Sequence, residues 1–386
     1  MPPSDVLQVA LPNLDFSSFL AALSSTSKAE ALRMAPSTSF LIPQNEAFKR
    51  LGLLVSAHLL SPSSKGDLEN VIMHHVLTTV EYADSIRDGS QHTFPTLESS
   101  DIKIERLTDG TIFASSSGGW AGFKAELQTR NFLTQTGVIH EMSDIMIPRS
   151  VHLTIGKLVK AAKGSTMTTL VNKAGFEWIL NGTAPPDGSP WADDKFGNVA
   201  WTLLCPPDEA LKEYNLTQLL SDIPTLKGIV SQHLIPTPPN RGLVDGELPL
   251  NTNQPLVFDK ATYSTVRSAD FEYGDLVFEQ RSDTQDYVVG IKGARGSTNK
   301  EDWARVTAWG RSTVGSGIGG VIQIDRLLIP YQPSWWVEYG APVTTGFLGI
   351  IFICMFFFVV RAIWRQDTTE ATYEPIGGFG RDDDDE

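Results

Sequence analysis

Two related stretches decide the fold: GVIHEMSDIMIP at residues 137–148 and GGVIQIDRLLIP at residues 319–330. Each begins with glycine, continues through apolar residues that favour β-structure, and ends in proline. We therefore interpret each stretch as a closing strand pair bounded by glycine and proline. Because the pattern occurs twice in one chain with its ends aligned, it indicates that one fold is used twice.

Helical patterns precede the first closing stretch. Residues 15–23 carry apolar side chains at the spacing i, i+3, i+4 and i+7, which predicts a helix with Asp15 as its N-cap. Residues 67–80 repeat that spacing, so they predict a second helix with His75 on its apolar face.

A strand and a turn into helix lie between these patterns. SFLIP at 39–43 predicts a short strand, and QNEAF at 44–48 predicts the start of a helix capped by Asn45. From residue 93 to residue 148 the apolar residues alternate with period two around a turn at Asp109-Gly110, which predicts strands.

Two helices and a polar loop open the second half of the chain. Apolar stripes predict helices at residues 155–162 and 170–174. Residues 181–198 are rich in glycine, proline and aspartate, which predicts a loop. The second half therefore begins with helices, as the first half does.

The strand and helix motifs of the first half then recur in the same order in the second half. WTLLCP at 201–206 corresponds to the SFLIP strand, and PDEAL at 207–211 corresponds to QNEAF. His233 ends an apolar stripe that matches the one ending in His75, and period-two strands return at 248–289. The chain thus contains an internal repeat of about 160–180 residues, helices first and strands after, which predicts an α+β fold used twice.

These motifs resemble the fasciclin (FAS1) domain in two tandem copies, at residues 1–148 and 152–330. The residues that match the family motif are Pro43, Asn45, His75, His140 and Pro148 in the first copy and Pro206, Asp208, His233, Asp325 and Pro330 in the second. The resemblance implies a β-sandwich-like wedge of strands packed with helices. It also implies an extracellular or vacuolar location and a role in cell adhesion, matrix contact or cell-wall association.

Some positions depart from the family pattern. The family often has tyrosine immediately before the helix histidine, and in its animal members that region is tied to integrin contact. Here the position holds His74 in the first copy and Gln232 in the second, which argues against an integrin-type contact. In the closing motifs, Ser143 replaces the aspartate of the first copy and Ile322 replaces the histidine of the second.

A membrane-spanning pattern follows the second copy. VTTGFLGIIFICMFFFVV at 343–360 contains no charged residue, and as a helix its 18 residues extend about 27 Å. We therefore predict one transmembrane helix rather than a buried core helix, preceded by an aromatic juxtamembrane segment at 331–342. Arg361 and Arg365 follow the span. The positive-inside rule then makes the acidic tail at 361–386 cytoplasmic and the preceding domains extracellular or lumenal, at the cell surface or in the vacuole or endosome.

The N-terminus raises a question of export. MPPSDVLQVALPNLDF has no basic region followed by a long apolar run, so it is not a secretory signal. Because the predicted topology exports this end, we expect the natural start to lie upstream of Met1; the alternative is that the span directs insertion. Cys205 is the only cysteine before the span, so these domains must be stable without an intrachain disulfide.

Three short motifs indicate modification or sorting. Asn181-Gly-Thr and Asn215-Leu-Thr are acceptor sequences for N-linked glycosylation, and the predicted topology exposes both to the modifying enzymes. In the tail, Tyr373 and Ile376 have the spacing Y-x-x-Φ that adaptor proteins read as a sorting signal; the alternative is a chance match.

No pattern of catalytic or metal-binding residues stands out. HExxH, G-x-S-x-G and Cys/His clusters are absent from the sequence, so we expect no catalytic, metal or cofactor site. GSGIGG at 315–320 satisfies G-x-G-x-x-G, but β-rich residues follow where a dinucleotide site needs a helix. We interpret His75 and His233 as buried structural histidines. The net charge of −14 argues against a nucleic-acid partner.

The sequence as a whole favours a non-enzymatic, membrane-anchored protein. It would act in cell adhesion, or in contact with matrix or cell wall, by binding extracellular or lumenal proteins or glycans. The alternative is a trafficking or cargo-binding membrane protein of the endosome–vacuole route, with adaptor proteins at its tail. An enzyme acting on wall polymers has no positive support in the residues.

Overall fold

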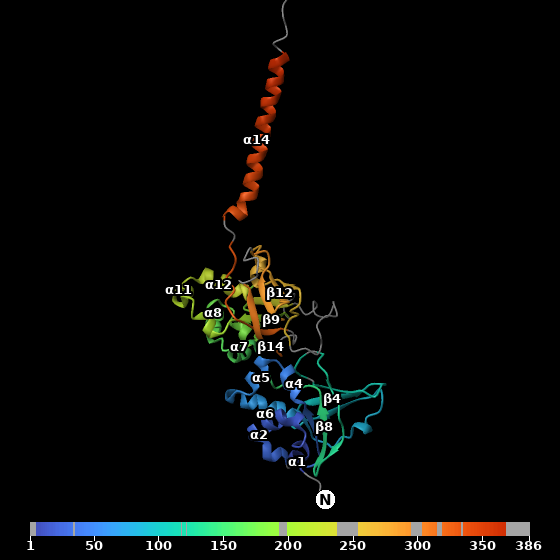
Figure 1. Cartoon of the computed structure of the whole chain (residues 1–386). Helices are drawn as coiled ribbons and strands as arrows, with labels where there is room; N and C mark the ends of the chain where they lie inside the picture. The colour runs from blue at the N-terminus through green and yellow to red at the C-terminus, as the bar shows by residue number, and fades with distance from the viewer. Residues whose placement is uncertain are drawn as a thin grey trace, which may run out of the picture. The chain divides into compact units, whose positions relative to one another are not determined.

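The computed structural model of the chain describes residues 5–33, 35–116, 118–120, 122–192, 199–237, 254–294, 303–314, 319–332 and 335–367. The chain divides into two compact units, Met1–Tyr331 and Gln332–Glu386. Figure 1 shows that the first unit contains helices followed by strands, twice, and that the second is dominated by one long helix, α14. The predicted α+β class is confirmed.

The helices of the first copy lie mainly in its first half. They are α1 (Val6–Ala10), the 3-10 helix η1 (Leu14–Phe16), α2 (Ser17–Ser25), α3 (Ala29–Arg33), α4 (Asn45–Arg50), α5 (Leu53–Leu59), η2 (Pro62–Ser64), α6 (Lys65–His74) and η3 (Ala83–Ser85).

The strands of the first copy form two sheets. One has the order β2 (Val76–Leu77), β1 (Thr38–Pro43), β8 (Gly137–Met142), β7 (Phe132–Leu133); the other has the order β3 (Gln91–Pro95), β4 (Asp101–Arg106), β5 (Ile112–Ser116), β6 (Ala125–Glu126). Successive side chains of a strand point to opposite faces. On β1, Phe40 and Ile42 pack with the helices, whereas Leu41 packs with Ile102 of the other sheet. The copy is therefore layered as helices, first sheet and second sheet.

The second copy repeats this order with one larger sheet. Its helices are α7 (Ile155–Ala161), α8 (Ser165–Lys173), α9 (Glu177–Asn181), α10 (Asp208–Leu211), α11 (Leu216–Ser221), α12 (Ile223–Gln232) and the 3-10 helix η4 (Val266–Ala269). Its strands have the order β10 (Leu234–Thr237), β9 (Ala200–Cys205), β15 (Gly320–Ile324), β14 (Ala304–Arg311), β13 (Tyr287–Ile291), β12 (Leu276–Gln280), β11 (Ala261–Tyr263).

In both copies the first strand lies parallel to the last, β1 beside β8 and β9 beside β15. The glycines of the closing motifs make this approach possible. A Cβ on Gly137 would lie 1.7 Å from the carbonyl oxygen of Thr38 on β1, and a Cβ on Gly319 would lie 2.6 Å from that of Trp201 on β9. Any other residue at either position would push the paired strands apart.

The two copies pack against each other through a shared apolar core that includes Val55 of α5 and Leu158 of α7. Gly310 of β14 faces α5, and a Cβ there would lie 2.9 Å from the Cβ of Leu54. The indole N–H of Trp120 in the first copy donates a hydrogen bond of 3.3 Å to the carbonyl oxygen of Arg311 in the second. These contacts explain why both copies fall within one compact unit.

Two predicted helix caps are wrong. Asp15 does not cap the first long helix, because Asn13 caps η1 through a 3.0 Å bond from the Asp15 N–H, and α2 begins only at Ser17. Asn45 does not cap its own helix, because α4 already begins at that residue. Its side chain instead accepts a 2.8 Å hydrogen bond from the N–H of Ser18 in α2.

Several predicted extents also change. The helix predicted at 67–80 ends at His74, because residues 76 and 77 pair with β1 as strand β2. Each closing stretch contains one strand, β8 or β15, followed by extended chain, and not a strand pair. Helix α9 occupies the start of the loop predicted at 181–198. Strand β14 was not predicted. Residues 193–198, 248–253 and 315–318 of the predicted loops and strands lie outside the described residues.

The second unit contains α14 (Trp335–Asp367). Its segment from Pro342 to Arg365 has a mean hydropathy of 2.6, and none of it is buried. Within the part of the chain that the structure describes, this is the one helix long and apolar enough to cross a membrane.

Candidate functional site

The motif histidines occupy equivalent positions. His75 and His233 are the C-caps of α6 and α12, and both are fully buried. Nδ1 of His75 lies 2.7 Å from the carbonyl oxygen of Val71, and its Nε2 accepts a 3.1 Å bond from the N–H of Met146. His233 makes the same two contacts, at 2.8 Å with Ile229 and at 3.1 Å with Leu328.

These contacts fix the chemistry of both imidazoles. Because Nε2 accepts an N–H, the proton must sit on Nδ1, which donates to the helix carbonyl. Burial lowers the pKa of each histidine to about 4, so both rings are neutral at physiological pH. Both nitrogens of each ring are used by the backbone, which leaves none for a substrate or a metal ion.

The motif Asn and Asp are equivalent caps that act across the fold. Asp208 accepts a 2.7 Å bond from the N–H of Thr166 in α8, as Asn45 accepts one from Ser18 in α2. Burial raises the pKa of Asp208, but the hydrogen bonds from Ser165 and Thr166 outweigh it and hold that pKa below its usual range. Both residues therefore stabilise the N-terminus of a neighbouring helix.

The other motif residues also serve the fold. Nε2 of His140 lies 2.8 Å from the carbonyl oxygen of Glu81, and Asp325 accepts a 2.8 Å bond from the N–H of Arg305. Two of the four motif prolines lie at strand ends: Pro43 is the last residue of β1, and Pro206 follows β9. Pro148 and Pro330 end the two closing stretches, several residues after β8 and β15. Pro43 and His75 line a small apolar cavity of about 10 Å³, and among the described residues no member of the family motif lines the larger pocket described below.

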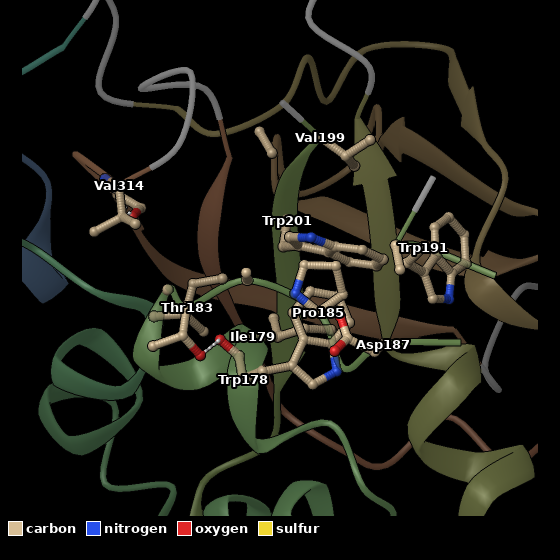
Figure 2. Close-up of a pocket in the computed structure, with 15 residues that line it drawn as sticks. Trp178, Ile179, Thr183, Pro185, Asp187, Trp191, Val199, Trp201 and Val314 are labelled. Carbon is tan, nitrogen blue, oxygen red and sulfur yellow. Dashed lines mark hydrogen bonds between the residues drawn. The ribbon is translucent and has the colours of Figure 1, made fainter. Parts of the chain in front are cut away.

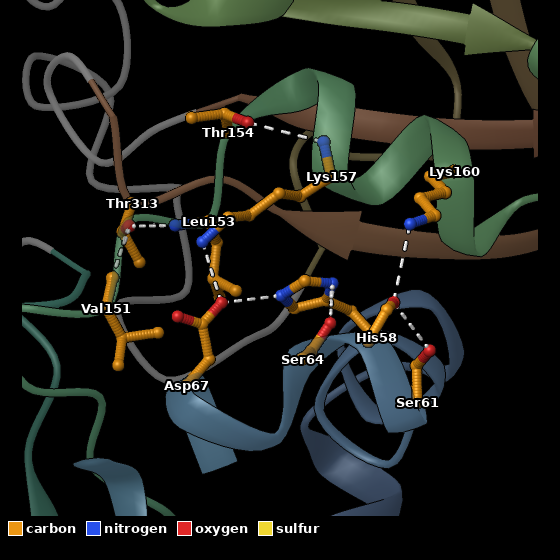
Figure 3. Close-up of polar contacts among 11 residues, drawn as sticks. His58, Ser61, Ser64, Asp67, Val151, Leu153, Thr154, Lys157, Lys160 and Thr313 are labelled. Carbon is orange, nitrogen blue, oxygen red and sulfur yellow. Dashed lines mark hydrogen bonds and ion pairs between the residues drawn. The ribbon is translucent and has the colours of Figure 1, made fainter. Parts of the chain in front are cut away.

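A polar cluster joins the two copies (Figure 3). Ser64 lies 3.1 Å from Nδ1 of His58, whose Nε2 lies 2.8 Å from Asp67; Lys157 of the second copy reaches the same carboxylate at 2.7 Å. The hydrogen bond from His58 and the charge of Lys157 lower the pKa of Asp67 against the opposing effect of burial. Although the residue types are those of a Ser-His-Asp triad, Ser64 is buried and the aspartate also binds lysine. The cluster therefore acts as a contact between the copies.

A pocket of about 440 Å³ lies in the second copy (Figure 2). Its walls come from the end of α9, the loop that follows, the start of β9 and the residues after β14. Three tryptophans line it. The ring of Trp201 lies 5.3 Å from that of Trp178 at 90° and 5.0 Å from that of Trp191 at 79°. The rings of Trp178 and Trp191 therefore meet that of Trp201 in edge-to-face contacts, and the exposed Asp187 adds a carboxylate to the lining.

The pocket adjoins one of the predicted glycosylation sites. Asn181 is the exposed last residue of α9, and the next two residues of its acceptor sequence, Gly182 and Thr183, line the pocket. The other acceptor, Asn215, is also exposed, and it caps α11 through a 3.2 Å bond from the N–H of Gln218. Tyr373 and Ile376 lie outside the described residues.

Sequence reasoning did not find the pocket. Its three tryptophans are spread over more than twenty residues, and only the fold brings Trp178 and Trp191 into contact with Trp201. The available signal was local: Trp178 precedes Asn181 by three residues, the spacing of neighbours on a helix. Among the described residues, no group of three or more His, Cys, Asp or Glu side chains is placed to hold a metal ion.

Comparison with known proteins finds similarity over parts of the chain. Residues 14–148 match the model of the fasciclin domain. Human periostin is 29% identical over 221 residues, which cover 57% of this chain but only 23% of periostin. A solved FAS1 domain pair from the insect cell adhesion molecule fasciclin I covers 83% of this chain and 95% of its own, at 13% identity and a TM-score of 0.28. Residues 14–148 are therefore a fasciclin domain, and part of the chain is similar in sequence to periostin.

Proposed function

We propose that this protein is a membrane-anchored adhesion protein that binds proteins or glycans of the matrix or cell wall. Residues 1–148 and 152–330 are its two fasciclin domains, placed outside the cell or in the lumen of the vacuole or endosome. The helix at 343–360 spans the membrane, and residues 361–386 form the cytoplasmic tail. The match of residues 14–148 to the fasciclin domain carries the proposal.

The geometry of the motif residues supports a binding role rather than catalysis. Both nitrogens of His75 and His233 are bound to the backbone, and Asn45 and Asp208 cap helices. Because these groups stabilise the fold, we expect partners to bind to other residues on the surface of the domains. The exposed apolar segment of α14 supports anchoring, because it leaves a full-length apolar surface for lipid.

Cell adhesion tests this proposal directly. Cells that express the full chain should aggregate, or attach to matrix or wall material, more strongly than cells expressing a control in which an unrelated folded domain replaces residues 5–331 before the same α14. Both chains must reach the same membrane at the same level. Equal adhesion by the two would contradict the adhesive role.

A second candidate is a trafficking or cargo-binding role in the endosome–vacuole route, favoured by the spacing of Tyr373 and Ile376. Adaptor proteins would read this signal on the cytoplasmic side. Tyr373→Ala should then shift the protein from endosomes or vacuole to the cell surface, whereas Tyr82→Ala, at an exposed tyrosine of the first copy, serves as a control. An unchanged distribution in Tyr373→Ala would remove the support for sorting.

A further inference from the structure

The aromatic pocket and the acceptor at Asn181 are parts of one local structure. Trp178 and Asn181 both belong to α9, at positions i and i+3, which are neighbours on a helix surface. Gly182 then takes the left-handed conformation, with φ of 68°, and turns the chain so that Thr183 also lines the pocket. A group attached to Asn181 is therefore attached beside two residues of the pocket lining, Gly182 and Thr183.

The pocket has the chemistry to receive a sugar ring. A pyranose presents a face of weakly positive C–H groups, which suits the negative face of an indole. Its hydroxyl and acetamide N–H groups can donate to a carboxylate such as that of Asp187 at the same pocket. The volume of about 440 Å³ is within the range of pockets that hold small ligands, so one or two sugar rings fit.

We propose that the first N-acetylglucosamine of a glycan linked to Asn181 occupies this pocket and stacks against one of its two partly exposed tryptophans, Trp191 or Trp201. The inference rests on the proposed function, because it requires residues 1–331 to face the lumen during synthesis. The glycan covers apolar surface that water would otherwise contact, and it joins α9 to the start of β9. No residue of the Asn215 acceptor sequence lines the pocket, so a glycan at Asn215 would have no such binding site.

The test compares the two glycans within one molecule. The full chain is produced in a eukaryotic secretory host, solubilised without denaturation and treated with peptide-N-glycosidase, and mass spectrometry follows release at each asparagine. Release at Asn181 should become at least about fivefold faster in Trp191→Ala, the change expected from losing one aromatic contact. Release at Asn215 should not change. Phe132→Ala, a partly exposed aromatic residue of β7 in the first copy, is the matched control and should alter neither rate.

A binding measurement addresses the pocket itself. Free diacetylchitobiose should bind the unglycosylated Asn181→Gln chain and not the glycosylated wild-type chain, whose pocket is already filled. Equal binding to both would show an open pocket that takes sugar from another source, which overturns the proposal. Equal release rates at Asn181 in wild type and Trp191→Ala would overturn it as well.

Failure of the inference is distinguishable from failure of the proposed function. If Asn215 carries a glycan and Asn181 does not, the lumenal orientation stands and the inference is wrong. If neither asparagine carries a glycan and protease added to sealed vesicles digests residues 1–331, these residues do not face the lumen. That result would contradict both the proposed function and the glycan inference.

Discussion

At the scale of single residues, the buried histidines link the fold to pH. His75 and His233 are neutral because burial lowers each pKa to about 4, whereas an unfolded histidine titrates near 6.5. Their position on an apolar helix face was predictable from spacing alone, but the helix end at His75 was not, because the predicted helix continued to residue 80. Their second partner was not, because the N–H groups of Met146 and Leu328 are separated in sequence from the histidines they contact.

We expect stability to be full above about pH 6.5 and to fall as the pH drops toward 4. Between these values the unfolded chain binds a proton at each histidine and the folded chain does not, so protons favour unfolding. The loss from pH 6.5 to pH 5 should be about 2 kcal/mol for each histidine. Thermal unfolding of the detergent-solubilised chain at these two pH values measures it.

One control and one further histidine define this prediction. The control is His92→Gln, a substitution at an exposed position, which should follow the wild-type profile. The fully buried His74, whose pKa burial lowers to about 3, adds to the loss in the same direction. An unfolding temperature that stays constant from pH 6.5 to pH 5 would contradict the prediction.

At the scale of elements, the sequence predicted periodic helices well and contacts between elements poorly. The helices at 155–162 and 170–174 are confirmed as α7 and α8, because an apolar stripe is a local property. Strand β14 escaped prediction because its buried positions include the small residues Ala304 and Ala308, which give a weak alternating signal. Asn45 was assigned to the wrong helix because its partner, Ser18, is distant in sequence.

The caps that act between elements give a second prediction. Asp208→Ala removes the acceptors for the first N–H groups of α8 and should lower the free energy of unfolding by about 1–2 kcal/mol. Asn45→Ala should have a similar effect on α2. Glu209→Ala, at the exposed neighbouring position, is the control and should change little. Denaturant unfolding measures all three, and equal stability of Asp208→Ala and Glu209→Ala would disprove the capping role.

At the scale of the whole molecule, the contact between the two copies could not be predicted from the sequence. The repeat predicted two similar domains, but not that α5 of one packs on β14 of the other through a shared core. Such contacts depend on how the surfaces of the two copies fit together. A sequence repeat indicates that the copies share a fold, but not how their surfaces fit. The aromatic pocket was missed for a related reason, since residues on three different segments build it.

The close packing between copies gives a third prediction. Gly310→Val inserts a branched side chain where a single Cβ would already lie 2.9 Å from Leu54, and it should destabilise the unit by about 1–3 kcal/mol. Gly66→Ala is the control, because a Cβ at that position contacts nothing within 4 Å. Hydrogen exchange should rise in both copies for Gly310→Val. A rise confined to the second copy would show that the copies do not stabilise each other.

The parallel pairing of first and last strands also dictates an order of events during synthesis. β9 is made early in the second copy, but its partner β15 is made only after the rest of that copy. The sheet therefore stays open until the ribosome has nearly reached the apolar segment of α14. In the proposed membrane-anchored topology, completion of the domain and delivery of the helix to the membrane become consecutive steps. Until β15 is made, the edge of β9 that does not pair with β10 needs protection by chaperones.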